Sequence, residues 1–268
     1  MKRRRNEMTE GKWNCGDRIV RFGRDGWVMV GRMTGDALVE LLDDRGVPTG
    51  RMESLEGMRC LPPCEPRAIW CVGVNYLNHA REMESAPPPE PCIFLKALTA
   101  LSEHEAPVRF PAWAGRIDYE GELAVVIGHD CKNVPEADAL DVVMGYACFN
   151  DVTARELQSA DGQWTRGKGF DGFAPLGPCL LLRREMPAEA VLRTRLNGRV
   201  VQEAHLGEMI FGVPRIIAHI SRFATLHAGD VIATGTPSGV GPVRDGDVVE
   251  VEIEGIGVLR NHFVGAGD

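Results

Sequence analysis

The sequence predicts an α+β protein in which β-strands outnumber helices. Short apolar runs, several of them alternating with polar residues, are separated by Gly, Pro and Asp along most of the chain. They show little of the strand–helix–strand alternation that builds a parallel α/β sheet. With 268 residues, 44% hydrophobic and 25% charged, the chain has the composition of a globular protein with one large domain, or a large and a small one.

The N-terminal part is expected to form short strands joined by turns. RIVRFG and WVMVGRM flank Asp25 and Gly26, an arrangement typical of a β-hairpin. LVELLDD follows as a further strand, and a Leu-Pro-Pro segment at 61–63 ends this part. We therefore predict a small β-rich domain over residues 1–65, without obvious chemistry, and a larger domain over 66–268.

The larger domain is expected to begin with a buried strand, AIWCVGVNY, and a helix from Leu77 to Glu84 that a cluster of prolines ends. PCIFLK is the next strand. Residues 134–143 are compatible with a helix that leads into the strand MGYACFN. Residues 153–158 fit a short helix capped near Asp151.

The clearest helix lies in the last third of the chain. Apolar residues at positions 210, 213, 216, 217, 220 and 223 give the segment 209–226 one apolar face. Strands follow in VIATG, in DVVEVEIEG, which alternates strictly, and in VLRNHFV.

The charge and the cysteine content limit which functions and cell compartments are expected. The 38 acidic and 30 basic residues give a net charge of −8, which argues against binding to nucleic acid or to anionic membranes. The basic opening MKRRRN lacks a following apolar core, and no apolar run approaches about 18 residues, so we expect a cytoplasmic protein. The eight cysteines form no C-x-x-C pair, and we expect reduced thiols.

The segment DYEGELAVVIG carries the strongest chemical signal. Glu120 and Glu122 lie two residues apart at the start of a strand-like run, so their side chains point the same way. Asp151 ends a second apolar run, GYACFN, about thirty residues later. Three such carboxylates would form an all-oxygen site for a hard divalent cation. The alternative is that both glutamates form the solvated face of an edge strand.

His79 and Glu82 are a candidate catalytic pair. Their spacing of three places them on one face of a helix, where the carboxylate would orient the imidazole and raise its basicity. The alternative is a solvated helix face.

Six segments occur in one order: GVNYLNHAREM, FLKALTAL, RIDYEGELAVVIG, GYACFNDVTARELQ, GKGFDGFAPLGP and VIATGTPSGVGP. Together they resemble the fumarylacetoacetate hydrolase family in its shorter microbial form, which includes acylpyruvate hydrolases and hydroxymuconate isomerases. The resemblance covers roughly residues 66–264. It implies a mixed β-sandwich roll as the catalytic domain and a homodimer.

The resemblance also implies roles for single residues. Glu120, Glu122 and Asp151 match the metal-binding carboxylates, which would hold one Mg²⁺ or Mn²⁺ per subunit. His79 and Glu82 match a dyad on a lid helix that activates water.

Four further residues match positions near the substrate. Lys168 in GKGFD matches an active-site lysine, although Gly169 stands where the family usually has serine. Lys96 and Gln158 match possible substrate contacts, and Thr236 matches a contact to the substrate carboxylate. The loop that contains Thr236 lacks the Gly-Lys-Ser/Thr ending of a phosphate-binding loop.

The implied reaction is divalent-metal-dependent hydrolysis of a C–C bond in a 2,4-dioxo acid of the acylpyruvate type, which releases pyruvate and a carboxylic acid. The His79–Glu82 pair favours hydrolysis, because attack by water needs a base. The alternatives are an isomerase of the 2-hydroxyhepta-2,4-diene-1,7-dioate type and an oxaloacetate decarboxylase. A non-catalytic metal-binding scaffold is a further alternative, whose expected sign would be a missing ligand or base.

Overall fold

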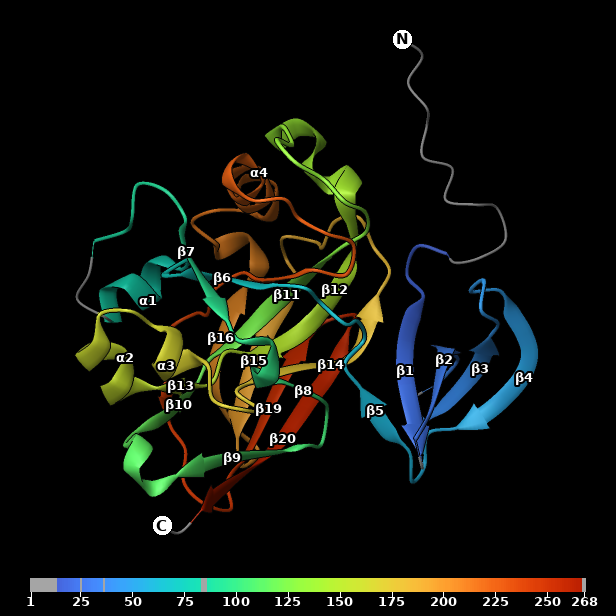
Figure 1. Ribbon diagram of the computed structural model, residues 1–268, viewed down its shortest axis with the longest axis horizontal. Helices are drawn as coiled ribbons and strands as arrows, with labels where there is room; N and C mark the ends of the chain where they lie inside the picture. The colour runs from blue at the N-terminus through green and yellow to red at the C-terminus, as the bar shows by residue number, and fades with distance from the viewer. Residues whose placement is uncertain (1–13, 25, 36, 83–85, 267–268) are drawn as a thin grey trace.

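The computed structural model describes residues 14–24, 26–35, 37–82 and 86–266. It confirms the strand-rich α+β class, because most ordered elements are strands arranged in three sheets of twelve, five and three strands. In Figure 1 the short helices α1, α2 and α3 lie at one side of the molecule, and the first strands lie at the opposite side.

The twelve-stranded sheet has the order β4-β3-β2-β1-β14-β12-β11-β17-β6-β7, with β5 on β1 and β8 on β14. Its strands are β1 (Arg18–Arg24), β2 (Trp27–Met33), β3 (Leu38–Leu42), β4 (Pro48–Ser54), β5 (Arg59–Leu61), β6 (Ile69–Gly73), β7 (Cys92–Lys96), β8 (Leu101–Ser102), β11 (Gly121–Ile127), β12 (Val143–Asn150), β14 (Ala174–Leu181) and β17 (Val231–Ala233).

The five-stranded sheet contains β16 (Arg199–His205), β15 (Val191–Leu196), β19 (Val248–Ile253), β20 (Gly257–Ala266) and β9 (Pro107–Pro111), in that order. The small sheet contains β13 (Thr153–Ala154), β10 (Ile117–Tyr119) and β18 (Gly241–Pro242). The α-helices are α1 (Leu77–Glu82), α2 (Arg155–Asp161), α3 (Thr165–Lys168) and α4 (Val213–Phe223). Short 3₁₀ helices are η1 (Leu98–Ala100), η2 (Ala112–Ala114), η3 (Glu136–Val142) and η4 (Leu206–Glu208).

The N-terminal strands continue the main sheet. β1 and β2 form the hairpin expected from the sequence, and Gly26 has the positive φ of 84° that such a turn requires. Asp25, the other expected turn residue, lies outside the described residues. β1 pairs with β14, and Phe22 of β1 packs in the same core as residues of the larger predicted domain. The division at residue 65 stays a prediction.

Of three predictions about helices, one extends beyond the described residues and two are corrected by the structure. Glu84 lies outside the described residues, so α1 is described to Glu82. Asp151 does not cap a helix, because the next residues form β13 and α2 begins only at Arg155. α4 is shorter than expected from the apolar pattern, since Pro214 lacks a backbone N–H and sits in the first turn.

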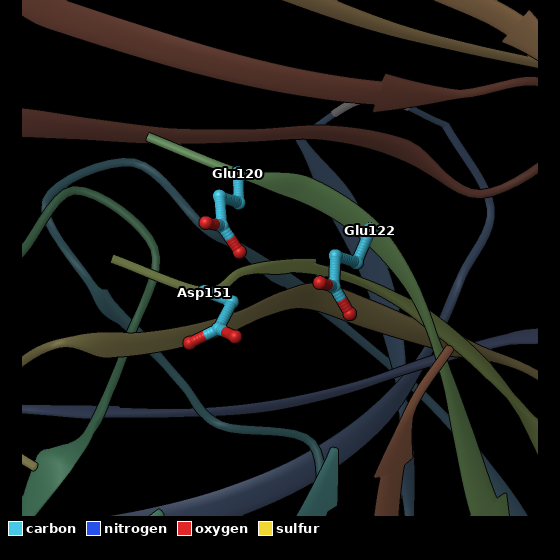
Figure 2. Close-up of side chains that lie close together, drawn as sticks. All are labelled: Glu120, Glu122 and Asp151. Carbon is cyan, nitrogen blue, oxygen red and sulfur yellow. The ribbon is translucent and has the colours of Figure 1, made fainter. Parts of the chain in front are cut away.

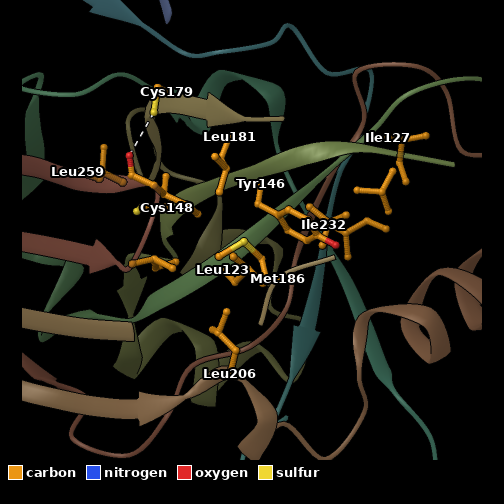
Figure 3. Close-up of a cluster of buried hydrophobic side chains, with 14 of the residues drawn as sticks. Leu123, Ile127, Tyr146, Cys148, Cys179, Leu181, Met186, Leu206, Ile232 and Leu259 are labelled. Atoms are coloured by element: carbon orange, nitrogen blue, oxygen red, sulfur yellow. Dashed lines mark hydrogen bonds between the residues drawn. The ribbon is translucent and has the colours of Figure 1, made fainter. Parts of the chain in front are cut away.

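Both faces of the main sheet are buried at its central strand β11. Leu123, Val125 and Ile127 of β11 contribute to one apolar cluster, and the alternating Ala124 and Val126 contribute to a second cluster on the other face. Strands β11, β12 and β14 pack against β15, β19 and β20 of the five-stranded sheet, which forms a sandwich. Figure 3 shows part of the first cluster, with side chains from β11, β12 and β14 in contact.

All eight cysteines are free thiols, in agreement with the sequence-based expectation. Within the described ranges, no helix has both the length and the apolar character needed to span a lipid bilayer.

Leu123→Ala should lower the free energy of unfolding by about 2–5 kcal/mol, because Leu123 is 1% exposed at the centre of the first cluster. Urea unfolding monitored by circular dichroism measures this value. Leu95→Ala is a matched control on β7, where the leucine is 47% exposed, and should change stability by about 0.5 kcal/mol or less. Equal losses in the two variants would contradict the assignment of the core.

Candidate active site

Three buried carboxylates meet where β11 and β12 pair. Glu120 directly precedes β11, Glu122 lies within it, and Asp151 directly follows β12. The antiparallel register places Gly121 opposite Asn150, and Asp151 N–H donates to Glu120 O at 2.9 Å. The three residues are 5%, 1% and 1% exposed, and one oxygen of each lies within 4.8 Å of the others. Figure 2 shows the three carboxylates lying close together, and because Glu120 and Glu122 are buried, the solvated edge-strand alternative is wrong.

Two buried lysines contact the carboxylates. Lys168 Nζ donates to Glu120 Oε2 at 2.8 Å and to Asp151 Oδ2 at 2.6 Å. Lys96 Nζ donates to Asp151 Oδ1 at 2.5 Å and to Val152 O at 3.0 Å. Asp151 is therefore held between two ammonium groups, and this fixes the orientation of its carboxylate.

Arg155 is a site residue that the sequence-based reasoning missed. Its guanidinium donates to Glu120 Oε1 at 2.6 Å, to Asp118 Oδ2 at 3.0 Å and to Gln158 Oε1 at 2.8 Å. Asp118 also binds Arg116, at 2.7 Å. The only available signal was the position of Arg155 inside VTARELQ, between Asp151 and Gln158. Sequence spacing does not show that α2 begins there and directs this guanidinium to Glu120.

The electrostatic environments of the two glutamates differ. Burial opposes ionisation of Glu120, but Lys168 and Arg155 outweigh it and hold the pKa of this carboxyl below its ordinary value. Burial raises the pKa of Glu122 well above its ordinary value, and the charges of Asp151 and Glu120 raise it further. Glu122 accepts a hydrogen bond from Gly235 N–H at 2.8 Å, and this bond lowers its pKa only in part.

These residues fit a divalent cation. The donors are three carboxylates, the hard oxygen ligands that Mg²⁺ and Mn²⁺ prefer, and they converge within 4.8 Å. Burial and, after it, repulsion from Asp151 and Glu120 keep the pKa of Glu122 high, and a bound cation would offset that repulsion. The metal ligands predicted from the sequence are thus brought together, and their function as ligands stays a prediction.

A cavity of about 220 Å³ opens onto the carboxylates. Of the residues predicted from the sequence, His79, Gln158, Lys168, Thr236 and the three carboxylates line it. An apolar wall is formed by Val72, Val74, Phe94 and Trp164. Lys96 is not part of this lining, because its ammonium is directed to Asp151 and to Val152 O. The structure therefore supports a positioning role for Lys96, and its predicted contact to substrate stays untested.

The His79–Glu82 pair is formed on α1. His79 is 6% exposed, and its Nδ1 lies 3.1 Å from Glu82 Oε2. Glu82 also accepts the N–H of Gly239, at 3.1 Å from Oε1. If Nδ1 carries the proton that Glu82 accepts, Nε2 is the free basic nitrogen. The pair thus connects α1 to the loop that carries Thr236.

One lining residue has a strained backbone. Val74 has φ of 55°, in the left-handed region that a β-branched residue rarely adopts. The adjacent Asn75 is fully buried and donates to Thr234 O at 2.7 Å and Phe211 O at 3.0 Å, while Phe211 N–H donates to Asn75 Oδ1 at 2.8 Å. These bonds hold the end of β6 in the conformation that places Val74 at the cavity.

Known proteins are similar to this chain in fold and in sequence. Residues 68–264 match the fumarylacetoacetate (FAA) hydrolase C-terminal family. The chain is 41% identical to 2-hydroxyhepta-2,4-diene-1,7-dioate isomerase from Mycobacterium marinum, with a TM-score of 0.85 over 94% of this chain and 100% of that one. It is 40% identical to 5-carboxymethyl-2-hydroxymuconate delta-isomerase from Mycobacterium smegmatis, with a TM-score of 0.86 over 94% and 100% of the two chains.

A curated relative adds a third named activity. The chain is 42% identical over 194 residues to the mitochondrial oxaloacetate tautomerase FAHD1 of Bos taurus, covering 70% of this chain and 87% of the relative. The chain belongs to the fumarylacetoacetate hydrolase family, as the six ordered segments predicted. The β-rich fold implied by that resemblance is confirmed.

Glu122→Gln should increase stability without divalent metal and weaken metal binding. The unfolded chain loses the Glu122 proton near the ordinary pKa of 4.5, whereas the folded chain keeps it to higher pH. The free energy of unfolding therefore falls as pH rises through this window, and the neutral amide removes that loss. Thermal melts from pH 4 to 8, with and without Mg²⁺, measure both effects. Equal stabilisation of the two proteins by Mg²⁺ would argue against Glu122 as a ligand.

Lys96→Met should lower the free energy of unfolding by about 3 kcal/mol, because it removes one cationic partner of the buried Asp151. Mg²⁺ should restore part of the loss by supplying positive charge beside the same carboxylate. Chemical unfolding with and without Mg²⁺ measures this recovery. Lys132→Met, at an exposed lysine, is the matched control and should change stability by about 0.5 kcal/mol or less.

Proposed function

We propose that this protein is a divalent-metal-dependent enzyme that moves a proton on a 2-oxo acid, as an isomerase or tautomerase. One observation carries the proposal: the three carboxylates, Lys168 and His79 line the same cavity. A base next to a cation site is the arrangement that enolisation beside a carbonyl needs. The isomerase and tautomerase activities named for similar proteins favour this chemistry over others.

Mg²⁺ or Mn²⁺ is the proposed cofactor, held by Glu120, Glu122 and Asp151. When bound, such a cation would act as a Lewis acid and stabilise negative charge on the oxygen of a 2-oxo acid. The protein's own part is to keep Glu120 ionised through Lys168 and Arg155 and to keep Asp151 oriented between its two lysines.

His79 is the proposed general base. With Glu82 accepting a proton from Nδ1, Nε2 would be free to remove a proton from the carbon next to the oxo group and to return it at another position. Lys168 uses two of its three N–H donors on Glu120 and Asp151. The third can stabilise an oxygen of the substrate, and this gives the lysine a role in both positioning and charge stabilisation.

Hydrolysis of acylpyruvates, the reaction predicted from the sequence, is the second candidate. The specific observation in its favour is the His79–Glu82 pair, which could equally deprotonate water for attack on a distal carbonyl. Oxaloacetate decarboxylation uses the same pyruvoyl half of the substrate. The homodimer and the cytoplasmic location remain parts of the proposal.

The deciding experiment offers the purified protein a panel of substrates with Mg²⁺, with Mn²⁺ and with a chelator. The panel contains the enol form of oxaloacetate, 2-hydroxyhepta-2,4-diene-1,7-dioate and a series of acylpyruvates. Ultraviolet absorbance follows loss of the enol or dienol, and a coupled assay follows pyruvate release. We expect metal-dependent absorbance change without pyruvate release from the first two, and a loss of at least about 100-fold in rate with His79→Asn.

Glu120→Ala serves as the inactive control, and Glu122→Gln is a second variant that should remain folded. Metal-dependent pyruvate release from acylpyruvates would establish the hydrolase instead. Pyruvate from oxaloacetate alone would establish the decarboxylase. No turnover of any member, by a protein that binds Mg²⁺, would overturn the proposed function in favour of the scaffold.

A further inference from the structure

We propose that Gln202 is a positioning residue that fixes the loop 234–239 relative to the metal-ligand strand, an inference that rests on the proposed function. Gln202 lies on β16 of the five-stranded sheet and is 2% exposed. It is not among the residues that line the cavity. Its side-chain amide nevertheless bonds to the segments that carry the lining residues.

The carboxamide oxygen of Gln202 supports the metal-ligand strand. It accepts the N–H of Gly121 at 3.0 Å, and Gly121 lies between the two glutamates of the site. This approach of the two sheets requires glycine, since a Cβ at Gly121 would lie 2.0 Å from Thr194 Oγ and 3.3 Å from Gln202 Oε1. The side chain of Gln202 thus contacts the backbone between Glu120 and Glu122.

The carboxamide nitrogen of Gln202 supports the loop. It donates to Thr236 Oγ at 2.8 Å and to Pro237 O at 2.8 Å, which uses both of its hydrogens. The orientation of the amide is unambiguous, because Gly121 N–H can only donate and Pro237 O can only accept. One side chain therefore links the strand and the loop.

The loop contacts both the carboxylate cluster and the His79–Glu82 pair. Gly235 N–H donates to the Glu122 carboxylate at 2.8 Å, and Gly239 N–H donates to Glu82 at 3.1 Å. Gln202 fixes Thr236 and Pro237, which lie between these two contacts. A shift of the loop would change the position of the His79–Glu82 pair relative to the carboxylates.

Gln202 also determines what Thr236 can offer to a substrate. Thr236 Oγ donates its single hydrogen to Gly121 O at 2.9 Å and accepts from Gln202, which leaves one lone pair. With these bonds intact the hydroxyl can accept a hydrogen bond but cannot donate one. It suits the hydroxyl of an enol or of a 2-hydroxy acid better than the carboxylate predicted from the sequence.

Gln202→Met tests the inference, because methionine has a similar size and removes all three bonds. Thr194→Val is the matched control: Thr194 pairs with Gln202 across the sheet, is fully buried, and its hydroxyl has no partner among the described residues. Thr236→Val breaks one of the same bonds from the loop side, for use if Gln202→Met does not fold.

Two measurements are made on each variant. Hydrogen exchange of the loop 234–239 needs no substrate, and we expect exchange at least about 10-fold faster in Gln202→Met and unchanged exchange in Thr194→Val. Calorimetry with Mg²⁺ and pyruvate, the 2-oxo acid moiety shared by the candidate substrates, should give a Kd for pyruvate raised by about 10-fold or more in Gln202→Met. The number of binding sites per chain should not change.

The outcomes separate the inference from the proposed function. A wild-type protein that binds Mg²⁺ but not pyruvate would overturn the proposed function, and the exchange data would still test Gln202. Unchanged loop exchange in Gln202→Met, or equal effects in Thr194→Val, would overturn the role of Gln202. If Gln202→Met had fewer pyruvate sites per chain but an unaltered Kd, Gln202 would be needed only for folding. That result would also overturn its proposed positioning role.

Discussion

The burial of three carboxylates within 4.8 Å of one another is the constraint on which the rest of the site depends. Like charges at this separation in a dry interior repel strongly, so the surrounding structure must supply positive charge and donors. Lys168 and Lys96 neutralise two sides of the cluster, and Arg155 supports a third. Burial, and then the charges of Asp151 and Glu120, still keep the pKa of Glu122 raised.

Both of the packed sheets contribute residues that build or support this site. The twelve-stranded sheet supplies the carboxylates through the pairing of β11 with β12, and it supplies Lys96 at the end of β7. Gln202 of the five-stranded sheet does not line the cavity, yet its side chain sets the distance between the carboxylate strand and the loop. Because the apolar clusters fill the sandwich around these few polar contacts, the polar groups must bond to one another.

The chemistry that this geometry supports is broader than a single reaction. A cation site beside an oriented imidazole stabilises an enolate whether the next step is proton return, water attack or loss of carbon dioxide. Proteins similar to this chain in fold and sequence carry different named activities, which include those of isomerases and an oxaloacetate tautomerase. Under the proposed function, the rest of the cavity lining would select the reaction; here it is an apolar wall with Phe94 and Trp164 and a polar side with Gln158.

The sequence by itself determined the β-rich class, the family and the common direction of Glu120 and Glu122, because the two-residue period of a strand is a local property. It also placed His79 and Glu82 together, since helix spacing is local. The meeting of Asp151 with the glutamates was predicted from the sequence, but it depends on the pairing of β11 with β12. Tertiary structure alone decided that Lys96 turns to Asp151 rather than to the cavity, and that Arg155 and Gln202 support the site. Gln202 contacts Gly121 across 81 residues and through the packing of two sheets. No local pattern encodes such a contact, because its register depends on how the whole sandwich closes.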